Sequence, residues 1–264
     1  NLKEAPADSI VVKLSFHEAN GQLIKEFATN SKERMDKLTD LKAGGNRFVW
    51  NMQYPGALRF DGMILWAAAL NGPKAVPGTY KVVLTIGKIQ QEQTFEIVKD
   101  PRSESSVEDY AKQFSFLIDI RDKVTEAHQA ILDIRETRKQ INHLKSIWKD
   151  DPEMKSLIQK ANDIDKEITR IENELYQTKN KSGQDPLNYP IKLTNKLAHV
   201  GSITNRGDFP PTQQAMQVKT ELSKQINAEL QKWETIKSSD MEAFNSLVKE
   251  KGIDVLKLKK EKSN

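Results

Sequence analysis

The sequence predicts an α+β protein: an antiparallel β-sandwich over residues 1–100, a long antiparallel helical bundle over 101–250, and a tail at 251–264. Glycine and proline usage supports this division. Eight of the twelve glycines precede residue 101, and residues 102–151 contain neither glycine nor proline. Apolar residues also change their spacing there, from short alternating runs to a helical repeat. We therefore expect a domain boundary at about residue 100.

The first part contains five short runs of β-forming residues: 10–16, 22–27, 46–52, 79–86 and 93–98. Asn20-Gly21 is a favoured hairpin turn, and Pro77-Gly78 is a second turn. Short strands at this spacing predict an immunoglobulin-like antiparallel sandwich. Residues 54–76 are too long for a simple hairpin loop, and we expect them to form an inserted excursion.

The second part begins with a long helix, expected from its N-cap Ser106 to about Trp148. Arg138 and Lys145 interrupt its apolar seam. Asp151 and Pro152 suit the N-cap and the first turn of a second helix. That helix carries apolar residues at alternating spacings of three and four, which is typical of a coiled coil: Met154, Leu157, Ala161, Ile164, Ile168, Ile171 and Leu175.

A short helix is expected at residues 191–200, and a third long helix after Pro210-Pro211. The third helix has an apolar seam that consists of Ala215, Val218, Leu222, Ile226, Leu230, Trp233 and Ile236. A short amphipathic segment containing Phe244 follows. Because helices this polar need partners to bury their seams, we expect an antiparallel, coiled-coil-like bundle.

Composition excludes several classes of site. The chain has no cysteine, so disulfides and thiolate metal sites are ruled out. Its dense charges nearly balance, with 41 Lys and Arg against 37 Asp and Glu, which argues against a nucleic-acid interface. No apolar run approaches the roughly 20 residues of a membrane span. Asn1 suggests a processed protein or a fragment, and the Lys-rich run 257–262 suggests a solvated tail.

The sequence shows no catalytic, cofactor or metal motif. Its four histidines form no ligand pair, and no phosphate loop, dinucleotide fingerprint or nucleophile elbow is present. We expect His17 on a sheet face, His128 at the edge of the bundle, and His199 in packing. The sequence therefore predicts no catalytic residue, no cofactor and no metal ion.

Aromatic residues offer the best candidate surface. Trp50, Tyr54, Phe60 and Trp66 fall close together in the chain. Exposed Trp and Tyr rings commonly stack on sugars or anchor protein interfaces. We interpret Trp50 as sandwich core. The candidate docking or ligand surface consists of Tyr54, Phe60, Met63, Leu65 and Trp66.

Several motifs resemble one bacterial family. GGNRFVWNMQYPGA from Gly44, GPKAVPGTYKVVLTIG from Gly72, FEIVKDPR from Phe95 and LTNKLAHV from Leu193 resemble the C-terminal region of sortilin-like, neuraminidase-repeat β-propeller proteins, often labelled glycosyl hydrolases. The resemblance implies an N-terminal propeller followed by an immunoglobulin-like domain akin to that of the hook-capping protein, then a helical segment. Asn51 departs from the Asp expected after the tryptophan. The S-x-D-x-G-x-x-W motif of the propeller blades is absent, so no hydrolase residue can be carried over.

These observations favour a non-catalytic accessory or scaffold module of a secreted or periplasmic bacterial protein. Its expected partner is the N-terminal propeller of the same polypeptide or another protein, without nucleic acid or membrane insertion. One alternative is a carbohydrate-binding module that stacks sugars on Trp66 and Tyr54. Another is a hydrolase with a site between the sandwich and the bundle.

Overall fold

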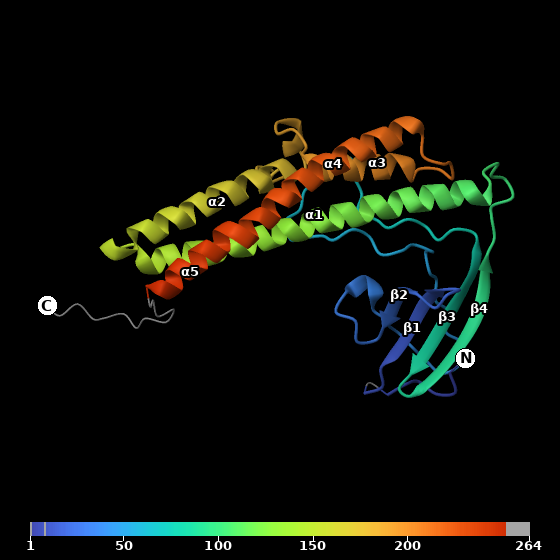
Figure 1. The fold of residues 1–264 in the computed structure, drawn as a ribbon. Helices are drawn as coiled ribbons and strands as arrows, with labels where there is room; N and C mark the ends of the chain where they lie inside the picture. The colour runs from blue at the N-terminus through green and yellow to red at the C-terminus, as the bar shows by residue number, and fades with distance from the viewer. Residues whose placement is uncertain (1, 8, 252–264) are drawn as a thin grey trace. The chain divides into compact units, whose positions relative to one another are not determined.

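The computed structural model describes residues 2–7 and 9–251, and it is of mixed α and β class, with one four-stranded antiparallel sheet and several helices (Figure 1). The strands are β1 (Val12–Glu18), β2 (Leu23–Ala28), β3 (Gly78–Ile86) and β4 (Ile89–Ile97). The α-helices are α1 (Val107–Trp148), α2 (Lys155–Leu175), α3 (Leu193–Thr204), α4 (Gln213–Thr235) and α5 (Glu242–Glu250). Three short 3₁₀ helices lie at Arg34–Asp36, Pro152–Met154 and Asp185–Leu187, and a π-helix spans Ile236–Met241.

The described residues form two compact units, each built from several stretches of chain. Unit 1 contains the N-terminal segment up to Ala57, Ala69–Asp122 and Val200–Gln217. Unit 2 contains Leu58–Ala68, Lys123–His199 and the chain from Val218 onward. The expected boundary at residue 100 stays a prediction, as does the tail at 251–264, most of which lies outside the described residues together with the Lys-rich run 257–262.

The sheet of unit 1 has the strand order β2-β1-β3-β4, with every neighbouring pair antiparallel. The turn expected at Asn20-Gly21 joins β1 to β2, and Gly21 adopts a φ of +91°, which glycine tolerates without strain. Phe16 on β1 is at the centre of an aromatic cluster. Its ring stacks on Trp50 at 4.4 Å between centroids and meets the edge of Phe95 at 6.2 Å. Trp50 thus packs half-buried against the sheet, and its expected place in the core of a sandwich stays a prediction.

The prediction of a strand at 46–52 is wrong, because this segment forms neither a helix nor a strand. The side chain of Asn51 accepts a hydrogen bond from the backbone N–H of Gln53 at 3.1 Å, which turns the chain. Met52 has a φ of +59°, a left-handed conformation that a β-strand cannot contain. A local side-chain turn has therefore replaced the pairing that the apolar pattern indicated.

The first long helix is confirmed. Ser106 and Asp109 form a reciprocal cap before α1: the Ser106 hydroxyl accepts from Asp109 N–H at 3.2 Å, and Asp109 Oδ2 accepts from Ser106 N–H at 3.0 Å. Asp151 is also confirmed as an N-cap, since its carboxylate accepts from Glu153 N–H at 3.0 Å. Pro152 opens one 3₁₀ turn, and α2 follows it.

The apolar seams of α2 and α4 become buried within unit 2, from Leu157 to Leu175 and from Leu222 to Trp233. Val218 was expected in the seam but is 46% exposed. It lies one turn before the first buried leucine of α4. Helix α3 runs from Leu193 to Thr204, four residues past its expected end, and within unit 1 its Gly201 lies against Ile120. A β-carbon there would lie 3.2 Å from the Ile120 side chain, which explains the glycine.

Candidate functional site

The excursion that carries most of the candidate surface is closed by its own backbone. In unit 1, Tyr54 N–H donates to Pro73 O at 2.9 Å, and Ala57 N–H donates to Leu70 O at 2.8 Å. Gly56 lies between these bonds, and a β-carbon on it would lie 2.1 Å from Leu70 O. Glycine is therefore required for the two legs to approach. We call residues 58–69, which these legs enclose, the closed loop.

The first residue of the closed loop is held at both of its backbone groups by α1. Within unit 2, Leu58 N–H donates to Thr125 Oγ1 at 3.1 Å, and His128 Nδ1 donates to Leu58 O at 2.6 Å. Thr125 and His128 are three residues apart, so they project from the same side of the helix. The helix thus supplies the pair of hydrogen bonds that a neighbouring strand would otherwise provide.

His128 is fully buried, so its expected place at the edge of the bundle is wrong. Burial lowers the pKa of His128, because the charged imidazolium would lose its hydration. Its Nε2 has no hydrogen-bond partner among the described residues, and the ring of Phe60 lies edge-on at 5.3 Å. His128 is therefore a neutral structural residue that positions the loop. The sequence signal was its i, i+3 spacing from Thr125.

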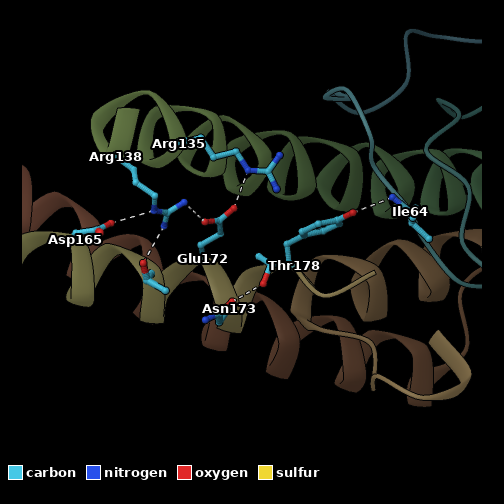
Figure 2. A network of polar contacts seen from close by, with 9 residues as sticks. Ile64, Arg135, Arg138, Asp165, Glu172, Asn173 and Thr178 are labelled. Atoms are coloured by element: carbon cyan, nitrogen blue, oxygen red, sulfur yellow. Dashed lines mark hydrogen bonds and ion pairs between the residues drawn. The ribbon is translucent and has the colours of Figure 1, made fainter. Parts of the chain in front are cut away.

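Phe60 lies in the core of unit 2 and is not part of an exposed surface. It is 8% exposed, and its ring meets that of Tyr176 edge-on at 5.1 Å. The Arg135 guanidinium lies over the Phe60 ring, 4.4 Å from its centroid, which is a cation–π distance. Tyr176 also accepts a hydrogen bond from Ile64 N–H through its hydroxyl at 2.8 Å (Figure 2). Phe60 therefore anchors the closed loop from inside.

An ion network around the buried Glu172 fixes the arginine that covers Phe60. Figure 2 shows Glu172 of α2 between Arg135 and Arg138 of α1. Its two carboxylate oxygens accept from Arg135 Nε and Arg138 Nη1, each at 2.7 Å, and Glu172 is only 3% exposed. Arg138 also donates to Asp165 and Thr169, each at 3.0 Å. The interruption of the α1 seam at Arg138 is thus a paired charge rather than a packing defect.

Trp66 is clamped at both backbone groups by one asparagine of α3. Asn195 Oδ1 accepts from Trp66 N–H at 2.7 Å, and Asn195 Nδ2 donates to Trp66 O at 2.8 Å. Asn195 is 5% exposed, whereas Trp66 is 38% exposed. Asn195, which makes the hydrogen bonds, is therefore buried, whereas Trp66 reaches the surface.

The residue after Trp66 is held in a strained conformation. Ala67 has a φ of +49°, which is uncommon for a residue with a β-carbon. His199 Nδ1 donates to Ala67 O at 2.6 Å, so this histidine is a hydrogen-bond donor to the loop. Asn195 and His199 are four residues apart and act from one side of α3. Such strain persists where neighbouring contacts over-determine the backbone.

Tyr54 belongs to unit 1, and its ring and hydroxyl both contact other residues of that unit. The phenol donates to Glu18 Oε1 at 2.8 Å, and the ring meets Phe114 at 4.8 Å between centroids. Burial, followed by the Glu18 carboxylate, raises the pKa of Tyr54. In the same unit, Ala69 N–H donates to the Ser202 hydroxyl at 2.7 Å, which holds the last residue of the closed loop.

The structure therefore separates the five candidate residues by role. Phe60 is buried, Tyr54 is half-buried in unit 1, and Met63 and Leu65 are half-buried in the closed loop. Trp66 is the exposed member of the set. The backbone clamps from Thr125, His128, Asn195 and Ser202 were not predicted from the sequence.

The described residues contain no group of three or more His, Cys, Asp or Glu side chains that could hold a metal ion. Within residues 2–7 and 9–251, no helix is both long and apolar enough to cross a membrane. No protein-family model matches the chain, and neither does a curated protein or a solved structure.

Proposed function

We propose that the chain is a non-catalytic accessory or scaffold module that docks a protein partner through Trp66. The observation that carries this proposal is the pair of hydrogen bonds by which Asn195 holds the Trp66 backbone, while Trp66 remains 38% exposed. An aromatic ring on a fixed backbone loses little conformational entropy on binding. Tryptophan is also the residue type most enriched at the energetic centre of protein interfaces.

Neighbouring residues support a protein contact at this place. Met63 and Leu65 are half-buried on the same closed loop, so part of each side chain remains available. An interface centre needs a large anchor surrounded by apolar contacts that exclude water. Trp66, Met63 and Leu65 together define the docking surface that we propose.

The partner that suits this proposal is an N-terminal β-propeller of the same polypeptide or a separate protein. The resemblance of the Gly44 and Gly72 motifs to sortilin-like, neuraminidase-repeat proteins supports this choice. In that setting the four-stranded sheet would belong to an immunoglobulin-like sandwich, and the helices to a long antiparallel, coiled-coil-like bundle. The protein would act in the periplasm or after secretion from a bacterium.

A carbohydrate-binding module is the second candidate, because an exposed indole face also stacks on sugars. The contacts of Tyr54 with Glu18 and Phe114 leave its ring poorly placed for this role. A sugar site would therefore rely on Trp66, without the second aromatic platform that the sequence suggested.

Tryptophan fluorescence separates the two candidates. Trp148 and Trp233 are 3% and 2% exposed, and Trp50 is half-buried, so quenching by acrylamide reports mainly on Trp66. The chain would be titrated with a polypeptide that carries a candidate propeller, with the fluorescence of that polypeptide alone subtracted, and, separately, with a panel of oligosaccharides. Docking predicts that the polypeptide protects Trp66 from quenching.

A matched pair of variants controls this experiment. Trp66→Ala should abolish binding of the polypeptide, whereas Tyr189→Ala, which truncates another ring of similar exposure at 37%, should leave it unchanged. Protection by oligosaccharides alone would replace the docking proposal with the carbohydrate one. Absence of protection by either titrant would reject both.

A further inference from the structure

Strand β4 is an open edge of the sheet in unit 1. It pairs with β3 along its whole length, and the described residues place no strand on its other side (Figure 1). Seven of its nine residues are exposed, with Phe95 and Ile97 half-buried. Alternate backbone N–H and C=O groups of an edge strand point away from the sheet and can pair with another chain.

Apart from the charges of Glu92 and Glu96, this edge lacks the features that usually prevent such pairing. Residues 89–97 contain no lysine, proline or glycine, and their register with β3 is continuous. The opposite edge is different. Strand β2 has a register irregularity opposite Phe16 and His17, and Leu38 N–H donates to Ala28 O at 3.0 Å beyond its end. Lys25 on β2 also pairs with Asp36 at 2.7 Å. Protection is thus stronger at β2 than at β4.

We propose that β4 pairs antiparallel with β4 of a second copy of this chain, with the two Gln93 residues opposite each other. Strand partners would then be Ile89 with Ile97 and Gln91 with Phe95 on one face. Gln90 with Glu96 and Glu92 with Thr94 would be partners on the other face. The two sheets would join into one continuous sheet across a twofold axis, an isologous contact.

The sequence of β4 selects this register over its neighbours. A shift by one residue would pair odd-numbered residues of one copy with even-numbered residues of the other. The half-buried Phe95 of one copy would then lie on the same side of the joined sheet as the exposed glutamates of the other. A shift by two places Glu92 opposite Glu96 in one direction and Glu92 opposite its own copy in the other. Like charges directly opposite each other destabilise a strand pair. The register centred on Gln93 avoids both clashes.

The self-complementarity of β4 favours a second copy of this chain as its partner. Each glutamate meets an uncharged polar residue, and the apolar end residues Ile89 and Ile97 meet each other. The register also pairs odd-numbered residues with odd-numbered residues. Backbone groups that point outward on one copy therefore meet groups that point outward on the other.

Two substitutions at one exposed position test the proposal. Thr94 would face Glu92 of the second copy twice in the dimer, once at each side of the axis. Thr94→Glu should raise the dimer dissociation constant by about 2- to 30-fold, from the usual range for two cross-strand charge pairs. Thr94→Lys should lower it over the same range. Sedimentation equilibrium over a concentration series measures both constants.

Within one chain, Thr94 is opposite Lys81 of β3, which pairs with Glu92 at 3.3 Å, and it lies between Glu92 and Glu96 on the same face of β4. Each substitution therefore also changes the stability of the monomer, and urea unfolding at a concentration where the chain is monomeric measures that effect separately from the dissociation constant. Hydrogen exchange gives an independent readout, because amides of β4 should gain protection at high concentration while those of β2 should not. Trp66→Ala should dimerise as the parent chain does, which keeps this test separate from the docking proposal.

A parent chain that remains monomeric at every concentration would overturn the inference. So would equal dissociation constants for Thr94→Glu and Thr94→Lys, or protection that appears outside β4.

Discussion

The grip of Asn195 on Trp66 gives the most direct test of how the closed loop is stabilised. Asn195→Ala removes two hydrogen bonds, at 2.7 and 2.8 Å, from a side chain that is 5% exposed. A typical net contribution is about 0.5–1.5 kcal/mol for each bond, so the loss should be about 2 kcal/mol. Water can reach part of Trp66 and offsets some of this cost. For a chain of this size the midpoint of thermal unfolding should fall by about 4–8 °C.

The same substitution should also loosen the indole. With its backbone released, Trp66 should become more accessible to acrylamide in the native protein. Asn195→Asp keeps the acceptor for Trp66 N–H but places a carboxylate oxygen against Trp66 O, so it should destabilise at least as much as alanine. Asn188→Ala, at an exposed position, is the control. An Asn195→Ala variant with an unchanged unfolding midpoint and unchanged quenching would refute the reasoning.

Three further predictions follow from contacts described above. Glu172→Ala leaves two guanidinium groups without their shared carboxylate, but their side chains are 34% and 24% exposed and Arg138 keeps Asp165, so the loss should be about 1–3 kcal/mol in urea unfolding. Glu172→Gln should cost less, and equal losses would mean that charge is not the cause. Because burial lowers the pKa of His128, the unfolded chain binds the proton first, so stability should fall as pH drops below the unfolded value of about 6.5. His128→Asn keeps a donor for Leu58 O and should flatten that pH profile, and an unchanged slope would exclude His128 as its source. Gly56→Ala should cost about 1–3 kcal/mol by thermal unfolding, since its β-carbon would meet Leu70 O, whereas Gly183→Ala has open space and should be near neutral; similar effects would contradict the close approach.

Local signals explain the elements that could be predicted. Ser106 and Asp109 form a reciprocal cap, and the residues that follow lack glycine and proline for a full 42-residue helix. Asp151 before Pro152 is equally local. The failed strand at 46–52 shows the limit of apolar pattern alone. The Asn51 side-chain turn and the left-handed Met52 depend on conformations that the pattern does not encode.

The candidate surface was harder to predict, because an aromatic-rich run does not reveal which ring faces inward. Phe60 and Trp66 are six residues apart, yet one lies under Arg135 and the other is exposed. The burial or exposure of each ring depends on a contact with a residue far along the chain. One usable signal was present in α3, where Asn195 and His199 are polar residues four apart. Such a pair indicates that the helix face binds polar groups of another segment.

The π-helix at Ile236–Met241 has a consequence for how this region tolerates changes in length. Ile236 and Phe244 are both buried, and they are eight residues apart. In a regular α-helix eight residues overshoot two full turns by about 80°, which would rotate Phe244 away from Trp148, the ring it contacts at 6.3 Å. The wider π turn absorbs the extra residue and restores the phase. Removing Ser238 should therefore leave Ile236 and Phe244 seven residues apart, with Phe244 still facing inward. A one-residue deletion, which would rotate the residues that follow it in a regular α-helix, should be tolerated here.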